Sequence, residues 1–117
     1  MMALYFSTLQ AFQQLNSNHQ IHESRSLRMH RKVAELLRQD PKGAIRYALG
    51  NLDRWQLQGV ECDDFEIWRK ILLAGPSDKL LEALIGMDDE AVRLRQSSPF
   101  AGMVSNDDRQ QILSYTR

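Results

Sequence analysis

The sequence predicts an all-α protein, a compact bundle of about five to seven short helices. Three observations indicate this class. Apolar residues recur at spacings of three and four along most of the chain, and most breaks between the periodic segments carry residues that cap helices. No segment shows the sustained apolar–polar alternation of a half-buried strand. The 117 residues are enough for one modest core, so we predict a single helical domain over 1–117.

The first periodic segment lies within residues 2–15, where apolar side chains share one face and glutamines separate them. A polar break follows at 16–22. We expect residues 1–22 to form an amphipathic helix that is either loosely packed on the bundle or dimerises, with packing favoured. The main bundle is predicted to span residues 26–117. The apolar residues of the first segment are Met2, Tyr5, Leu9, Phe12 and Leu15.

Two longer helices are predicted next, over residues 26–39 and 41–58. Asp40 and Pro41 supply an N-cap and a first helical residue, since proline lacks an N–H that would be unpaired there anyway. Gly59 is the expected C-terminal stop. The apolar face of the earlier helix holds Leu27, His30, Val33, Ala34 and Leu37. The predicted buried stripe of the later one holds Ile45, Ala48, Leu49, Leu52 and Trp55.

Three shorter helices are expected after residue 62. The first is capped by Asp63 or Asp64, ends at Gly75-Pro76, and has an apolar face made of Phe65, Trp68, Ile71 and Leu72. The second begins after Ser77 and ends at Gly86, and the third begins after Asp88. Ser105 and Asp108 resemble a capping box, which predicts a last helix that contains Ile112 and Leu113.

The segment from Arg93 to Met103 interrupts the helical pattern with a specific non-helical sequence. Pro99 disfavours helical geometry at the preceding serine. In the structural interpretation, which we favour, Phe100 fills the core and Pro99 fixes the turn. In the functional interpretation a rigid loop presents an aromatic residue and arginines, which are preferred interface anchors. The partner-binding residues would then be Arg93, Arg95, Ser97, Ser98 and Phe100.

Patterns that indicate catalysis or metal binding are weak in this sequence. His19 and His22 could share a helical face, but a zinc site needs three or four ligands and no matching pair is present. The acidic neighbours of Cys62 disfavour the thiolate that a nucleophile needs. We therefore expect no enzyme activity, no cofactor and no metal site. An enzyme would need a pocket that joins His30 to the arginines and serines of the 93–103 segment.

Three features of the sequence indicate where the protein is located in the cell. A single cysteine excludes an internal disulfide and suits a reducing cytoplasm. The longest apolar runs are only a few residues, so no membrane span is expected. Residues 1–6 lack the basic start of a signal peptide. We expect a cytoplasmic protein.

Charge is unevenly distributed, although the formal net charge is +0. Residues 25–54 contain eight lysines and arginines against three acidic residues, and residues 61–90 contain nine acidic residues against three basic ones. The favoured interpretation is that the two halves face each other or are solvated. The alternative is a basic face for nucleic acid or an acidic partner. The candidate nucleic-acid-binding residues are Arg25, Arg28, Arg31, Lys32 and Arg38.

Several short strings carry a resemblance to a known family. They are His30-Arg31-x-Val33-Ala34, Asp40-Pro41, Asn51-Leu52-x-Arg54-Trp55, Trp68, and the run from Arg93 to Gly102 that reads RLRQSSPFAG. Over residues 29 to 113 the chain resembles a family of small bacterial helical proteins encoded in or beside toxin–antitoxin loci. Some members carry an N-terminal helix-turn-helix domain, and this chain has no recognisable DNA-binding domain in its first 28 residues.

The resemblance implies a protein-binding role, namely antitoxin-like neutralisation of a partner toxin from a neighbouring gene. The leading hypothesis is therefore a non-enzymatic protein-interaction module. Under this hypothesis Phe100→Ala weakens the complex while the fold survives. The alternative is a regulatory protein that binds nucleic acid through the basic residues of 25–54, with a homodimer possible in either case.

Overall fold

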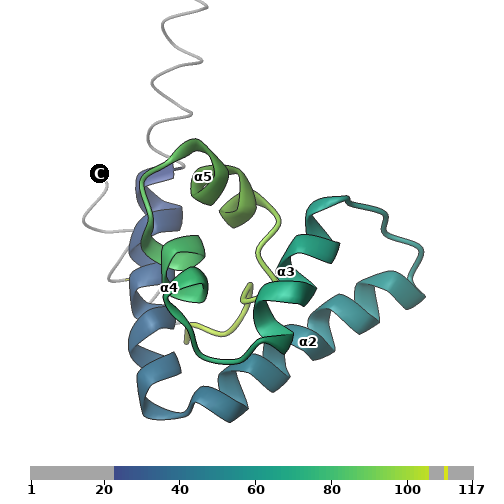
Figure 1. Ribbon diagram of the computed structural model, residues 1–117, viewed down its shortest axis with the longest axis horizontal. Coiled ribbons are helices and arrows are strands. Elements are labelled where there is room, and N and C mark those ends of the chain that lie inside the picture. The colour runs from purple at the N-terminus through teal and green to yellow at the C-terminus, as the bar shows by residue number, and fades with distance from the viewer. Residues whose placement is uncertain (1–22, 106–109, 111–117) are drawn as a thin grey trace, which may run out of the picture.

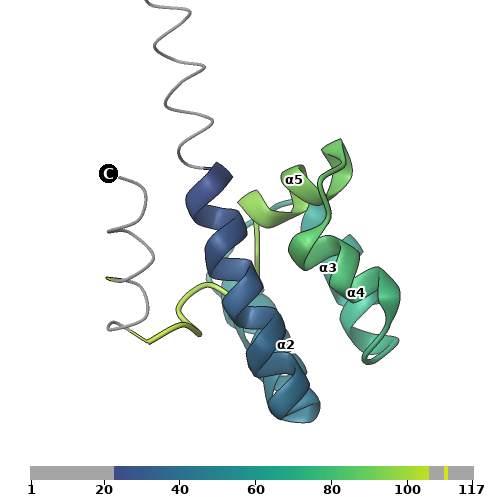
Figure 2. The same cartoon turned by 90° about the vertical axis from the view of Figure 1, so that its left-hand side faces the viewer.

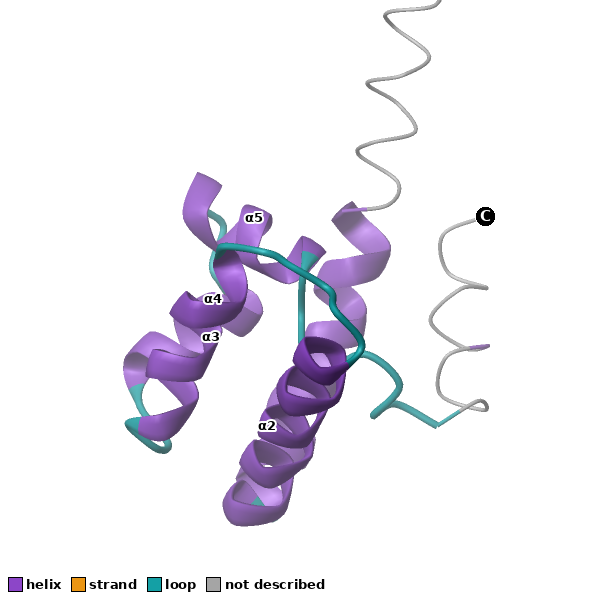
Figure 3. Ribbon diagram, turned by 90° about the vertical axis from the view of Figure 1, so that its right-hand side faces the viewer, coloured by secondary structure: helices purple, strands orange, loops and turns teal. Residues whose placement is uncertain are grey.

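The computed structural model describes residues 23–105 and residue 110, and over residues 23–105 the chain forms five helices and no strand (Figures 1 and 3). The helix over residues 23–39 is followed by α2 (Pro41–Leu57), α3 (Asp64–Leu73), α4 (Asp78–Ile85) and α5 (Asp89–Gln96). The predicted all-α class is confirmed. The helices predicted within 2–15 and after Ser105 fall outside the described residues.

The helix boundaries follow the predicted capping residues. Three N-cap side chains accept a hydrogen bond from the backbone N–H three residues later: Asp40 from Gly43 at 3.0 Å, Ser77 from Leu80 at 3.1 Å, and Asp88 from Ala91 at 3.2 Å. Each such cap stabilises a helix by about 1 kcal/mol. Asp63 is the N-cap of α3 by position but makes no side-chain cap bond.

The first two described helices form an angle, and the other three pack against them. The helix over residues 23–39 and α2 meet at Asp40 and diverge, and α3 returns antiparallel to α2 (Figure 1). Turned by 90°, the molecule shows α3, α4 and α5 on one side of this pair (Figure 2). The chain after α5 then runs back between the helices. This arrangement brings residues 97–104 against α2, far from them in sequence.

One cluster of buried apolar side chains joins all five helices to the segment after α5. Trp68 of α3 is fully buried, and its ring meets the edge of the Phe100 ring at a centroid distance of 6.0 Å. The predicted stripe of α2 is rotated in part. Ala48 and Leu52 are buried as expected, whereas Ile45, Leu49 and Trp55 are only half-buried. Ala44 and Asn51 take their place in the core.

Candidate protein-interaction surface

The segment after α5, for which the sequence allows a partner-binding interpretation, is held against α2 by hydrogen bonds. The Asn51 side-chain amide donates a hydrogen bond to the Pro99 carbonyl at 2.7 Å, and the Tyr47 hydroxyl donates to the Ala101 carbonyl at 3.0 Å. Phe100 is 2% exposed. The structural interpretation of this loop is confirmed, because its aromatic residue fills the core and its backbone is held by side chains of α2.

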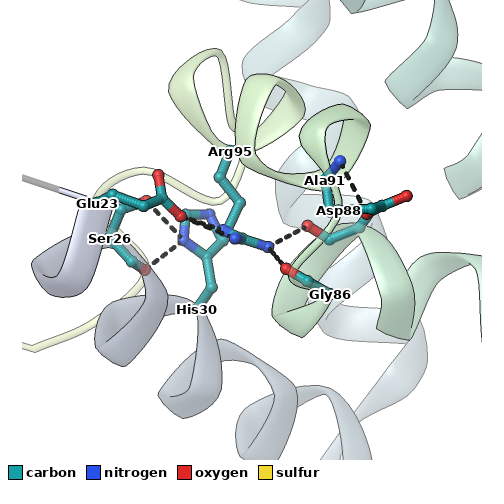
Figure 4. A network of polar contacts seen from close by, with 8 residues as sticks. Glu23, Ser26, His30, Gly86, Asp88, Ala91 and Arg95 are labelled. Atoms are coloured by element: carbon teal, nitrogen blue, oxygen red, sulfur yellow. Dashed lines mark hydrogen bonds and ion pairs between the residues drawn. The ribbon is translucent and has the colours of Figure 1, made fainter. Parts of the chain in front are cut away.

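Arg95 is the centre of a buried polar cluster (Figure 4). Its guanidinium donates to the Glu23 carboxylate at 2.7 Å and to the Gly86 carbonyl at 2.7 Å, with a longer bond to the Ala83 carbonyl at 3.4 Å. The Arg95 side chain is 0% exposed and that of Glu23 is 23% exposed. The cation is therefore neutralised and hydrogen-bonded inside the protein. Because Glu23 takes part, the packed bundle includes a residue three positions before the predicted start.

The structure does not favour Arg95, Ser98 and Phe100 as parts of an exposed partner-binding surface. All three are buried, so they expose little area to another molecule. Arg93 remains exposed on α5, where its Nε lies 3.3 Å from both Asp64 carboxylate oxygens. Ser97 is half-buried at the C-cap of α5. For Arg93 and Ser97, partner binding stays a prediction.

His30 is buried beside this cluster, and its Nδ1 lies 2.7 Å from the Ser26 carbonyl oxygen (Figure 4). Since a carbonyl oxygen can only accept, Nδ1 carries the hydrogen. Burial lowers the pKa of His30, opposed by its bond to Ser26. The nearby Arg95 lowers this pKa further, and Glu23 raises it. The imidazole is therefore favoured in its neutral form.

A cavity of about 170 Å³ adjoins His30 and does join it to an arginine and a serine of the later segment. Apolar residues supply much of its wall: Met29, Val33, Phe100, Ala101 and Val104. Three of its polar side chains, Ser98, His30 and Arg95, form hydrogen bonds within the chain. Ser98 Oγ accepts the Phe100 N–H at 3.2 Å, and Nδ1 of His30, which carries a hydrogen, cannot accept the proton of the Ser26 hydroxyl. Among these described residues, no nucleophile is paired with a base.

The burial of His30 predicts that acid destabilises the protein. Because the folded-state pKa lies below the unfolded value of about 6.5, the unfolded chain binds more protons as the pH falls through that value. The stabilising contribution of neutral His30 is present above about pH 6.5 and is lost below it. We expect the free energy of unfolding to drop between pH 7.5 and pH 5.5 in urea titrations. The drop should be smaller in His30→Gln, and an equal drop in both proteins would contradict this assignment.

The predicted nucleic-acid-binding residues do not form one free basic face. Arg31 and Arg38 are exposed, whereas Arg25, Arg28 and Lys32 are half-buried and have interactions within the chain. Lys32 pairs with Glu35 at 3.3 Å. Three of the five side chains are therefore less available to phosphates than the sequence pattern indicated.

An apolar groove lies instead between the first three turns of α2 and the C-terminal end of α3. Its volume is about 550 Å³. Ile45 and Leu49 line the α2 side, and Leu72 and Leu73 line the α3 side. Leu73 is 68% exposed. A leucine held this far out on the wall of an open groove is available to contact another molecule.

Sequence reasoning missed this groove, although the end of α3 carries one signal. Ile71, Leu72 and Leu73 are three consecutive apolar residues at the end of a helix, and a helix cannot turn three consecutive side chains toward the same core. Ile71 and Leu72 are buried, so Leu73 points outward. Ile45 and Leu49 are half-exposed for a different reason, because this side of α2 is left uncovered by the described chain.

Within the described residues, no group of three or more histidine, cysteine, aspartate or glutamate side chains could hold a metal ion. His19 and His22 lie outside those residues. None of the described helices is long and apolar enough to cross a membrane. Comparison with protein-family models, curated proteins and solved structures found no match to this chain.

Proposed function

We propose that this protein is a non-enzymatic, antitoxin-like interaction module that binds and neutralises a partner toxin from a neighbouring gene. The observation that supports binding is the groove between α2 and α3, with Leu73 exposed on its wall. Exposed apolar surface with a polar rim is characteristic of protein-binding sites. The resemblance of residues 29 to 113 to proteins of toxin–antitoxin loci supplies the class of partner.

The groove replaces the 93–103 segment as the proposed contact surface. The buried members of that segment support the fold, since Arg95 and Phe100 hold the α5 end and the core together. Among the apolar side chains that line the groove, in contrast, Ile45, Leu49 and Leu73 are not fully buried by the fold. A partner could therefore occupy it without any rearrangement of the described helices.

Leu73→Asp tests the proposal. We expect this variant to bind the product of the neighbouring gene at least tenfold more weakly in calorimetric titrations, because a charge replaces an apolar contact on the wall of the groove. Growth arrest by that gene product should be relieved on co-expression of the wild-type chain and should persist with Leu73→Asp. Circular dichroism should show unchanged helix content.

Leu57→Asp is the matched control. Leu57 is the last residue of α2, as Leu73 is the last residue of α3, and it is 89% exposed but lies outside the groove. Both variants place an acidic residue at a helix C-terminus, so their effects on helix stability are alike. Equal binding by the two variants, or no complex with the wild-type chain, would reject the proposed function.

A further inference from the structure

The groove has a charge pattern that points to one kind of occupant. Lys42 and Arg46 lie at its end near the start of α2, and both are exposed. Neither has an ion-pair partner among the described residues. At the other end, Asp53 is neutralised by Arg69 at 2.9 Å. As far as the described residues show, the groove therefore offers two cations without an ion-pair partner beside an apolar floor, which favours an apolar segment that carries carboxylates.

A second observation comes from Gly50, which lines the groove in the middle of α2. Glycine inside a helix is less stable than alanine. Among the described residues there is no internal reason for it, because none of their atoms outside its own helix backbone and chain neighbours lies within 4 Å of the position that a Cβ would occupy. Gly43, in contrast, is explained within the fold, since a Cβ there would collide with the Asp40 cap. The space above Gly50 is suited to the close approach of another backbone.

The length of the groove fits a helix. Its α2 wall runs from Lys42 to Asp53, which at the rise of an α-helix is about 16 Å, or three turns. Two helices form its walls, an arrangement that accepts an amphipathic helix through apolar anchors spaced three and four residues apart. A small residue at the crossing point lets the helix axes approach closely.

We propose that the groove binds an acidic amphipathic helix of the partner, whose backbone crosses α2 at Gly50 and whose carboxylates meet Lys42 and Arg46. This inference rests on the proposed function and deepens it by naming the chemistry of the bound segment. The glycine supplies the close contact, the leucines supply the apolar area, and the two cations set the orientation of the helix.

Two synthetic 14-residue helical peptides test this inference. Both have a leucine stripe, and one carries glutamates where the other carries lysines. Titrated into the full ¹⁵N-labelled chain, the glutamate peptide should shift the amide resonances of Gly50 and Leu73. It should bind roughly tenfold more tightly than the lysine peptide, as expected for two close charge pairs. Lys42→Glu/Arg46→Glu should reverse this preference, and Arg31→Glu/Arg38→Glu, with the same charge change outside the groove, should leave it intact.

Gly50→Ala tests whether the glycine serves peptide binding and not the stability of the chain. We expect its melting temperature to rise by roughly 3–6 °C while its affinity for the glutamate peptide falls about tenfold. Equal binding of the two peptides, shifts confined to other residues, or unchanged affinity of Gly50→Ala would overturn the inference. If Leu73→Asp weakens the toxin complex while Lys42→Glu/Arg46→Glu does not, the proposed function stands and the acidic helix is wrong.

Discussion

Arg95→Ala should destabilise the protein by about 3–5 kcal/mol, the cost of removing one member of a buried ion pair. The wild-type guanidinium is fully buried and binds the Glu23 carboxylate and the Gly86 and Ala83 carbonyls. Its loss leaves these acceptors without a donor and leaves a cavity behind. Because small domains are stable by only about 5–15 kcal/mol, the midpoint of urea unfolding should shift strongly.

Arg93→Ala is the matched control for this prediction. It removes the same side chain from the same helix, but Arg93 is 53% exposed and its contact with Asp64 is at the surface. Exposed pairs contribute about 0–1 kcal/mol. A loss below 1 kcal/mol in Arg95→Ala, or equal losses in the two variants, would show that the buried cluster does not support the fold.

Phe100→Ala should lower the free energy of unfolding by about 3–5 kcal/mol, because it removes a buried aromatic side chain that packs against the Trp68 ring. This expected loss differs from the hypothesis drawn from the sequence, in which the same variant weakens a complex and leaves the fold intact. Thermal unfolding followed by circular dichroism and by tryptophan fluorescence measures the loss.

Leu57→Ala provides the comparison for Phe100→Ala. Leu57 is 89% exposed, so its truncation should change the free energy of unfolding by less than about 0.5 kcal/mol. If Phe100→Ala were as stable as Leu57→Ala, the aromatic ring would not belong to the core. The segment after α5 would then have to be considered again as a contact surface.

The helices could be predicted from the sequence because their signals are local. The caps Asp40, Ser77 and Asp88 act on backbone groups three residues away. Gly59 and Gly75 have φ of 82° and 83°, and glycine adopts this conformation without steric cost. None of these features depends on how the helices pack, so the pattern of residues is sufficient to place them.

The site could not be predicted in the same way, because its parts are distant in sequence. Asn51 holds Pro99 across 48 positions, and Glu23 neutralises Arg95 across 72 positions. From the sequence alone, Arg95 is predicted to be a surface residue, because its partner Glu23 is not identifiable by sequence spacing. Buried members of this string, including Leu94, Arg95, Ser98 and Phe100, show that much of it specifies the fold. The groove depends on which side of α2 remains uncovered, which only the packing decides.

The long reach of the Arg95–Glu23 pair has a consequence for biosynthesis. Glu23 leaves the ribosome 72 residues before Arg95, which at about 5–20 residues per second is a delay of roughly 4–14 s. Until the end of this interval the apolar side of the 23–39 helix, with Val33 and Leu37, lacks the last members of its core, Leu94, Phe100 and Val104. A nascent chain interrupted before residue 95 should therefore expose apolar surface. We expect such chains to be bound by chaperones or degraded, so that only completed polypeptides accumulate.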